Sequence, residues 1–483
     1  FIGKTNSPPH AATDTKIRPS PAHGLVQAPT TKPAMLKPGM CADGVWRNPR
    51  DVAMAKACVP PHYVNTKHLR IASNAVRQLL DMDVRAEDKQ LLTFEECFMG
   101  KQGNDLYTPM NRQASPGYGW KKGLGVGKNP WLTTSDGEWR FDHPEVLEKF
   151  AAKEVLLSCG ERPQFMWIDT LKDERRPPSK TDVGKTRLFS AGEMIGTALL
   201  RKYFMGFCAH VMRHPVEFES CVGLNVYGMH WDQLARALQT HGDHVVAGDF
   251  TNYDGSLSAQ ILWEVCDIIN DYYGDEYAEE RRLLWLEIVN SIHVSGENVY
   301  MWNHSQPSGC AFTTILNSVY HSIAVRMVYL ACAEKYCPDE ASMQSFLKHV
   351  VHVNYGDDDV TNIHPSILEW FNQHTMTEMY NTLGMVYTDE TKCGNPPRSR
   401  TLAEVKFLKR SFVYDRHQTR WRAPLCDETI LEMTNWVHGS DGMFLLSLEL
   451  EQAVYEAAQH PREKYEWFLQ RMAPVQRLVR SSY

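Results

Sequence analysis

Residues 347–363 read LKHVVHVNYGDDDVTNI, and this stretch decides the fold. Residues 347–355 and 360–363 are rich in β-branched side chains, and Gly356-Asp357-Asp358 separates them. Two such runs around a short glycine-containing turn are typical of paired antiparallel strands. We therefore predict a β-hairpin with two carboxylates at its turn.

A second acidic strand end lies upstream of this hairpin. Residues 244–249 (HVVAGD) predict a short, largely buried strand that ends at Asp249. A turn-like stretch that contains Asp254 follows, and the apolar spacing from Ser258 onward predicts a helix. If this strand and the hairpin are neighbours in one sheet, Asp249 converges with the two acids of the turn.

Clustered carboxylates repel one another, so a site built from Asp249, Asp357 and Asp358 needs a cation between them. Oxygen ligands with room left for water and phosphate suit Mg²⁺ or Mn²⁺. Two such ions can activate an attacking hydroxyl and stabilise a leaving oxygen in phosphoryl transfer. Acids are also common in turns, which is the simpler explanation for Asp249 alone. The tetrapeptide Tyr355-Gly356-Asp357-Asp358 is much more specific.

Two further polar residues could recognise a sugar. Asp254 lies five residues after Asp249, and Asn317 lies near the start of a long predicted helix that follows the tight loop 306–309. A carboxylate beside an amide can hydrogen-bond a ribose 2′-hydroxyl, the group that distinguishes ribonucleotides from deoxyribonucleotides. Either residue taken alone is more often a cap or a surface group.

The segment 172–187 is basic within an acidic chain. It carries six Lys and Arg against three acids, whereas the whole chain has a net charge of −7. Pro177, Pro178 and Gly184 favour a loop or strand pair over a helix. Such a run is most often a solvated face, and the alternative is a channel for a phosphate-bearing ligand.

Composition sets broad limits on the class of protein. The chain has 483 residues, of which 43% are hydrophobic and 23% charged, which fits a large multi-lobed enzyme or two to four domains. The apolar segment 324–333 is interrupted by Arg326, so we expect no integral membrane segment. Twelve cysteines without a C-x-x-C pair favour free thiols. Seven prolines within residues 1–40 predict an extended N-terminal segment.

The order of these segments resembles the RNA-dependent RNA polymerases of picorna-like positive-strand RNA viruses. In the palm, the likeness is carried by Asp249-Phe250-Thr251-Asn252-Tyr253-Asp254, by Ser308-Gly309-Cys310 with Thr313 and Asn317, by Tyr355-Gly356-Asp357-Asp358, by Lys392 and by Phe407-Leu408-Lys409-Arg410. Upstream, it is carried by Lys172-Asp173-Glu174 with Arg176, Lys180, Lys185 and Arg187, and by Ser115-Pro116-Gly117-Tyr118. On this resemblance, the basic segment is a nucleotide channel.

The resemblance implies an α+β fold, a closed right-hand polymerase. Its parts would be fingers, a palm built as an antiparallel sheet with helices, similar to an RNA-recognition motif, and a helical thumb. The implied boundaries are 1–206 for the fingers, including an N-terminal segment that links fingers to thumb, 207–289 for the palm, 290–306 for a fingers insertion, 307–412 for the palm again, and 413–483 for the thumb.

The resemblance also assigns roles to residues. Asp249 and Asp357, assisted by Asp358 and the carbonyl of Phe250, would hold two Mg²⁺ ions, for which Mn²⁺ can substitute. Lys392 would be the general acid for pyrophosphate. The nucleotide-binding residues would be Lys172, Arg176 and Arg187 at the triphosphate, Asp254, Thr313 and Asn317 at the ribose, and Ser308 with Gly309 in a flexible loop beside template and nucleotide.

The implied partners are a viral RNA template and primer, ribonucleoside triphosphates, a small uridylylated viral peptide that serves as primer, and other viral replication proteins. The implied location is the host cell cytoplasm, at membrane-associated replication complexes. Release from a polyprotein is expected as well, and Phe1 in place of Met agrees with it.

Two residues depart from the usual pattern. Phe312 stands where picornaviruses usually have glycine, and Asp359 adds a third acid that we expect to be a solvated strand residue. With the chain length, they favour insect-infecting relatives such as iflaviruses or dicistroviruses. Three alternatives remain: an inactive polymerase-fold scaffold that binds RNA, a metal-dependent phosphohydrolase, and a reverse transcriptase. The last usually has a bulky aromatic residue where Asp254 stands.

Overall fold

The computed structural model describes residues 1–121, 125–392 and 394–481, and residues 122–124, 393 and 482–483 lie outside the described part. Its central element is a four-stranded antiparallel sheet with the order β12-β13-β9-β14. The strands are β9 (Val245–Thr251), β12 (Val350–Tyr355), β13 (Asp358–Ile363) and β14 (Val386–Asp389). The predicted hairpin is confirmed, and it begins at Val350 because the preceding residues form helix α13 (Met343–His349).

Helices cover this palm sheet, with α12 (Thr313–Tyr336) packed against β12 and α14 (Gln373–Thr382) against β14. Residues 315–330 of α12 are all buried, because α2 (Thr66–Leu79), α10 (Ala259–Tyr273) and α14 also contact this helix. Within the described part of the chain, α12 is the one helix long and apolar enough to span a membrane. Its most apolar window is 94% buried inside the protein, so α12 is a core helix.

A second sheet joins segments that are distant in sequence. Its order is β1-β11-β10-β6-β8, with β1 (Gly3–Lys4), β6 (Met166–Leu171), β8 (Leu188–Ala191), β10 (Ile292–Ser295) and β11 (Asn298–Met301). Strands from the segment 290–306 therefore pair with strands from the segment 1–206. The buried helix α7 (Met194–Arg213) follows β8 and contacts α5 (Pro144–Ser158), α10 and α11 (Ala278–Val289).

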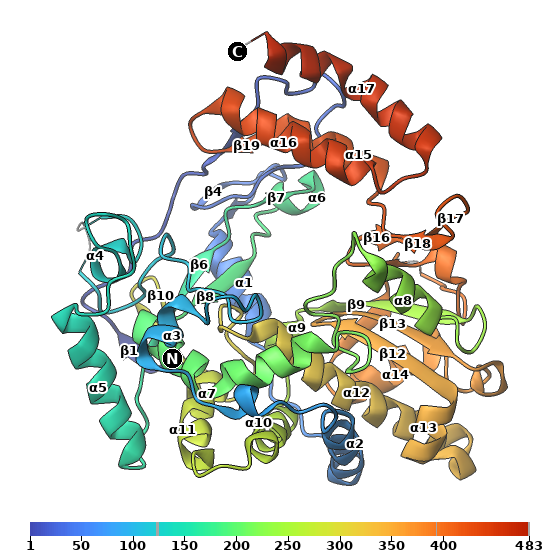
Figure 1. Cartoon of the computed structure of the whole chain (residues 1–483), viewed down its shortest axis with the longest axis horizontal. Helices are drawn as coiled ribbons and strands as arrows, with labels where there is room; N and C mark the ends of the chain where they lie inside the picture. Colours follow the sequence, from blue (N-terminus) through green and yellow to red (C-terminus); the bar gives the residue numbers. More distant parts are fainter. Residues whose placement is uncertain (122–124, 393, 482–483) are drawn as a thin grey trace.

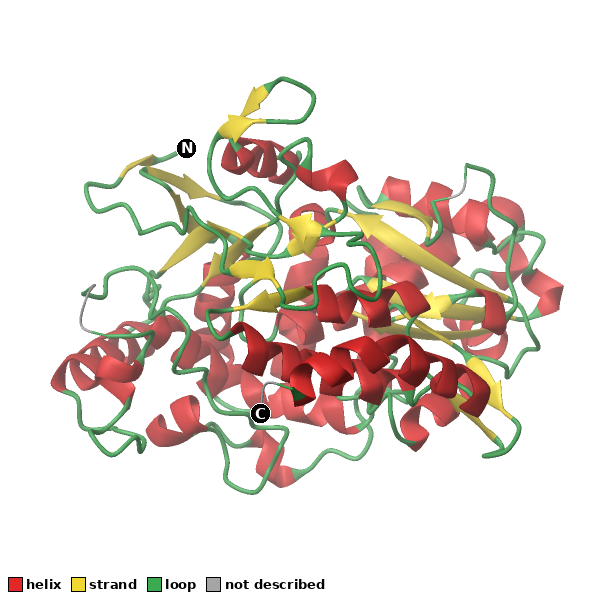
Figure 2. Ribbon diagram, turned by 90° about the horizontal axis from the view of Figure 1, so that it is seen from above, coloured by secondary structure: helices red, strands yellow, loops and turns green. Residues whose placement is uncertain are grey.

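The N-terminal segment reaches the C-terminal helices. Strand β2 (Ile17–Pro19) pairs with β19 (Trp436–His438), and β3 (Lys32–Pro33) pairs with β7 (Arg175–Arg176). In Figure 1 this segment, in blue, runs to the red helices α15 (Asp427–Glu432), α16 (Gly442–Ala457) and α17 (Arg462–Arg480). Figure 2 shows strands and helices mixed throughout, as expected for an α+β fold.

The remaining elements are short. They are β4 (Gly39–Met40), β5 (Trp46–Arg47), α1 (Pro49–Ala57), α3 (Phe94–Met99), α4 (Asn129–Leu132), α6 (Pro178–Thr181), α8 (Met229–Ala237), α9 (Tyr253–Ser256), β15 (Lys406–Phe407), β16 (Arg410–Ser411), β17 (Val413–Asp415) and β18 (Arg420–Arg422). The basic segment 172–187 contains only one helical turn, α6, so the expectation of a largely non-helical segment is confirmed.

Candidate active site

The two acidic strand ends meet in the palm sheet. Strand β13 pairs with β9 so that Asp359 is opposite Gly248, which places Asp249 beside the hairpin turn. Burial, followed by the charges of Asp254 and Asp249, raises the pKa of Asp357. Burial and the charges of Asp357, Glu390 and Asp249 raise the pKa of Asp358 to about 7. These carboxylates lie close enough to disfavour one another's ionisation, as predicted from the sequence.

The donor set of this cluster fits a hard divalent cation, because it consists of carboxylate and carbonyl oxygens. Among the described residues, no three Asp, Glu, His or Cys side chains converge on one point. A cation between Asp249 and Asp357 would therefore need further oxygen ligands, such as the Phe250 carbonyl, water or phosphate. One oxygen of Asp358 is already engaged, since it accepts a hydrogen bond of 2.6 Å from the backbone N–H of Leu408.

Lys392 lies at the same acids. Its Nζ is 2.7 Å from Oδ2 of Asp249, and both side chains are partly open to solvent. The backbone of Lys392 adopts a left-handed conformation with φ of 56°, just after strand β14, which pairs with β9. The ammonium group thus supplies the nearest positive charge to a predicted metal ligand.

The three predicted triphosphate cations surround one acid, Glu174. Arg187 Nε donates a hydrogen bond of 2.7 Å to Glu174, and the side-chain nitrogens of Lys172 and Arg176 lie 3.9 Å from the same carboxylate. Lys172 and Arg187 are half exposed, whereas Glu174 is largely buried. A single carboxylate therefore holds three cations together, and two of them face solvent.

Sequence reasoning missed one member of this basic group, Lys56 at the end of α1. Burial and then the charges of Arg176, Lys180, Arg187 and Lys392 lower the pKa of Lys56, so all five belong to one positive region. The side chain of Asn252, after β9, donates a hydrogen bond of 3.1 Å to the Lys56 carbonyl oxygen. No local spacing signals this position, because the contact joins residues almost 200 positions apart.

The predicted ribose pair is assembled as expected and has a third member. Asn317 Nδ2 donates to Oδ1 of Asp254 at 2.7 Å. Gln306 Nε2 donates to Oδ1 of Asn317 at 2.7 Å and to Oδ1 of Asp254 at 3.3 Å. Gln306 Oε1 is buried and lacks a hydrogen-bond partner among the described residues. Burial raises the pKa of Asp254, although the Asn317 and Gln306 amides oppose the shift.

Thr313 and Ser308 stabilise the loop that precedes α12. The Thr313 hydroxyl is within hydrogen-bond distance of the carbonyl oxygens of Cys310 (3.0 Å), Ser308 (3.2 Å) and Pro307 (3.4 Å). The hydroxyl is therefore engaged with loop carbonyl oxygens in this structure, and its role at the ribose stays a prediction. Ser308 Oγ accepts a bond of 3.3 Å from the Ser190 N–H.

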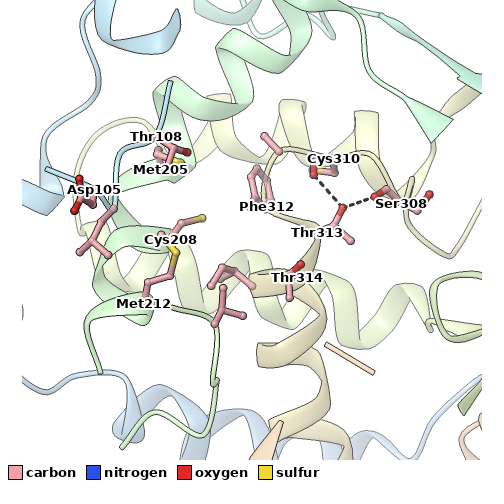
Figure 3. A pocket seen from close by; sticks show the side chains of 14 residues that line it. Asp105, Thr108, Met205, Cys208, Met212, Ser308, Cys310, Phe312, Thr313 and Thr314 are labelled. Atoms are coloured by element: carbon pink, nitrogen blue, oxygen red, sulfur yellow. Dashed lines mark hydrogen bonds between the residues drawn. The ribbon is translucent and has the colours of Figure 1, made fainter. Parts of the chain in front are cut away.

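Gly309 and Phe312 fix this loop against the fingers. A Cβ at Gly309 would lie 2.1 Å from the Ser190 carbonyl oxygen, so only glycine permits this approach. The Phe312 ring packs against Phe204 and Trp285, with centroids 5.0 and 6.3 Å away. A cavity of about 330 Å³ lies between the loop, α7 and residues 105–108 (Figure 3).

Asp359 is not the solvated residue that we expected. It is fully buried, and the Tyr387 hydroxyl donates to its Oδ2 at 3.3 Å. Burial, reinforced by the charge of Asp358, raises the pKa of Asp359 well above its ordinary value and so favours the neutral form of its carboxyl group. The expectation was wrong because β13 is an interior strand, and alternate side chains of such a strand point to opposite, covered faces.

Comparison with known proteins agrees with this geometry. A family model described as viral RNA-dependent RNA polymerase matches residues 24–476. The chain is similar to part of the replicase polyproteins of Acute bee paralysis virus (39% identity), Drosophila C virus (37%) and cricket paralysis virus (35%), over 95–96% of its own length. It spans about a quarter of the length of these polyproteins. The expected likeness to polymerases of insect viruses is confirmed.

A solved structure shows the same fold. The Sicinivirus 3Dpol RNA-dependent RNA polymerase superposes with a TM-score of 0.79 at 22% identity, covering 98% of this chain and 93% of that one. The predicted α+β right-hand architecture is thereby confirmed. The domain boundaries and the roles of individual residues stay predictions.

Proposed function

This chain belongs to the viral RNA-dependent RNA polymerase family, and on that premise we propose that it synthesises RNA from ribonucleoside triphosphates on a viral RNA template, thereby replicating the viral genome. The observation that carries the proposal is the meeting of Asp249 on β9 with Asp357 in the turn before the neighbouring strand β13, with Lys392 2.7 Å from Asp249. Clustered carboxylates in such a position suit divalent cations, which can in turn bind phosphate oxygens.

Asp249 and Asp357, with Asp358 and the carbonyl of Phe250, would hold two Mg²⁺ ions, and Mn²⁺ would substitute for them. When bound, these ions would activate the primer 3′-hydroxyl and stabilise the leaving oxygen of pyrophosphate. The left-handed turn at Gly356 projects Asp357 out of the sheet, where it is exposed and accessible to a cation.

The basic residues would receive the triphosphate. Oxygens of an incoming triphosphate would replace part of the contact that Lys172, Arg176 and Arg187 make with the Glu174 carboxylate. Positioned cations stabilise the charge that builds up during phosphoryl transfer. Lys392 would deliver a proton to the departing pyrophosphate, which requires its ammonium to leave Asp249.

The ribose would be recognised by Asp254 and Asn317, with Gln306 orienting both side chains. Ser308 and Gly309 would border template and nucleotide. Beyond the chain, we propose a small viral peptide primer and other viral replication proteins as partners, in the host cytoplasm at membrane-associated replication complexes. The similar chains are parts of replicase polyproteins, which supports other viral proteins as partners.

Primer extension on a short RNA template tests the function. We expect extension that requires Mg²⁺ or Mn²⁺, that prefers ribonucleotides to deoxyribonucleotides, and that is lost in Asp357→Ala while RNA binding remains. Extension by Asp357→Ala would disprove the metal assignment. RNA binding by the wild-type chain without extension under either metal would instead favour the scaffold, and RNA hydrolysis would favour the phosphohydrolase.

A further inference from the structure

Helix α12 holds both backbone polar groups of Gly356, the residue before Asp357. The Gly356 N–H donates to Ser318 Oγ at 2.9 Å, and His321 Nδ1 donates to the Gly356 carbonyl oxygen at 3.0 Å. Ser318 and His321 are three residues apart, so they project from the same face of the helix. Because a carbonyl oxygen only accepts, the proton of the neutral ring is on Nδ1.

The rest of the His321 ring contacts α14 and strand β9, which carries Asp249. Its Nε2 accepts a bond of 3.2 Å from the Tyr380 hydroxyl of α14. Its ring meets the ring of Phe250 edge-on, with centroids 5.1 Å apart at an angle of 82°. Phe250 directly follows Asp249. One imidazole therefore touches the residue next to each predicted metal-binding aspartate.

The Gly356 turn depends on conformation more than on space. Gly356 has a φ of 68°, and a Cβ there would find only ordinary contacts, 3.7 Å from Asn317 and Thr314. Such a left-handed turn is held by its hydrogen bonds, and His321 supplies one of them from a fully buried position. Burial, reinforced by His352, lowers the pKa of His321 to about 3, so the ring keeps one protonation state throughout the neutral range.

We propose that His321 is a positioning residue, which sets the separation of Asp249 and Asp357 and thereby the affinity of the site for divalent cations. The inference rests on the proposed function, because it assumes that these two aspartates share the cations. His321 would act through the Gly356 backbone and the Phe250 ring, without touching substrate.

His321→Phe and His352→Phe form a matched pair for the test. His352 is equally buried, and its pKa is also lowered to about 3, by burial and then by the charge of Arg326. The His352 ring packs against the His321 ring, with centroids 5.0 Å apart, but it hydrogen-bonds Thr361 at 2.9 Å and Asn354 at 3.3 Å and leaves the Gly356 carbonyl to His321. His321→Phe keeps the ring but leaves the Gly356 carbonyl without its donor.

We expect His321→Phe to raise the half-saturating Mg²⁺ concentration for primer extension by about tenfold and to lower kcat by a similar factor, since groups that orient metal ligands typically contribute 10–100-fold. The KM for RNA should not change. Mn²⁺ binding without nucleotide, followed by electron paramagnetic resonance, should weaken in parallel. His352→Phe should keep the wild-type metal dependence.

His321→Asn provides the rescue, because its amide N–H can occupy the place of Nδ1–H. It should recover most of the metal affinity, and Tyr380→Phe, which removes only the outer bond, should have a smaller effect than His321→Phe. Equal metal affinity in His321→Phe and wild type, or equal losses in both Phe variants, would overturn the proposal. If wild type fails to extend primers, the proposed function fails, and Mn²⁺ binding by the same variants still decides the positioning role. If His321→Phe does not fold, His321→Asn and Tyr380→Phe carry the test.

Discussion

Two regions of this protein surround their carboxylates with opposite electrostatic environments. Where the N-terminal segment meets the thumb, Glu432 accepts hydrogen bonds from Thr31 Oγ1 (2.6 Å), Asn435 Nδ2 (2.7 Å), Trp436 Nε1 (3.2 Å) and the N–H groups of Thr31 (3.1 Å) and Thr30 (3.2 Å). Burial opposes its ionisation, but these bonds prevail and lower the pKa of Glu432.

In the palm, the balance is reversed. Burial and neighbouring negative charges raise the pKa values of Asp357 and Asp358, and few donors compensate them. A carboxylate that accepts many hydrogen bonds stabilises the fold. A carboxylate with few hydrogen-bond donors near other negative charges lowers the stability and can still bind an external cation. The contrast separates a structural acid from a functional one. Substituting the structural acid should lower the stability of the protein, whereas substituting the functional one should leave the stability unchanged or raise it.

The largest effect is expected for Asp357→Asn, which removes charge without changing shape. Primer extension should fall by about 10³-fold or more, because the amide is a poor ligand for Mg²⁺. The melting temperature, measured without metal, should be unchanged or higher, since a repelling charge is lost. Asp359→Asn is the control, because Asp359 is fully buried in β13 and its raised pKa favours the neutral form, so it should keep most of the activity. A lower melting temperature in Asp357→Asn would remove the distinction between the regions.

The second prediction concerns Glu432→Gln. The amide brings one acceptor oxygen and an N–H₂ group against several donors, so opening of the N-terminal segment should become easier by about 2–3 kcal/mol. Amide hydrogen exchange at Thr30 and Thr31 should then accelerate by about 100-fold. Exchange in β12 and β13 should stay slow, which makes these strands the internal control. Unchanged exchange at Thr31 would show that the β2–β19 pairing holds the segment by itself.

The sequence predicted the parts of this contrast that depend on local pattern. The hairpin and the strand predicted to end at Asp249 follow from apolar runs and turn residues, although β9 continues to Thr251. Their meeting was a conditional prediction that the β9–β13 pairing confirms. Glu432 carries no local signal, because its donors Thr30 and Thr31 are about 400 positions away. Its role depends on which surfaces the fold brings together.

The misjudged and missed residues have the same physical origin. Asp359 was expected to be solvated, yet its environment is set by strands on either side of β13. Lys56 and Gln306 join their clusters only through tertiary contacts. The hydrogen bonds of the Thr313 hydroxyl to loop carbonyl oxygens likewise depend on the folded loop, while its role at the ribose stays a prediction.

Asp254 has fewer hydrogen-bond donors than Glu432 but more than Asp357. Asn317→Asp should make its environment resemble that of Asp357, with a second negative charge in place of a donor. Burial raises the pKa of Asp254, and two amides partly compensate it. The substitution replaces a donor with a second acid, so the pair should lose its defined orientation. Discrimination between ribo- and deoxyribonucleotides should fall by about tenfold, measured as the ratio of kcat/KM values. Gln306→Met, which leaves Asn317 and Asp254 in place, should produce a smaller loss. Unchanged selectivity in Asn317→Asp would exclude a ribose role for this pair.

The smallest effect is a difference in pH dependence. Since the folded pKa of Glu432 lies below the ordinary value of about 4.3, its stabilisation is fully present above that pH and is lost as the pH falls through the lower folded value. The stability gap between wild type and Glu432→Gln should therefore persist to about pH 4 and narrow only below it.

The folded pKa of Asp357 is raised, so its destabilising charge is present at high pH and is relieved as the pH falls toward the ordinary value of about 3.9. The gain in stability of Asp357→Asn over wild type should thus shrink first. Melting temperatures of wild type, Glu432→Gln and Asp357→Asn between pH 8 and pH 3.5 would show both pH ranges. If the two stability differences from wild type shrink at the same pH, both acids have the same electrostatic environment.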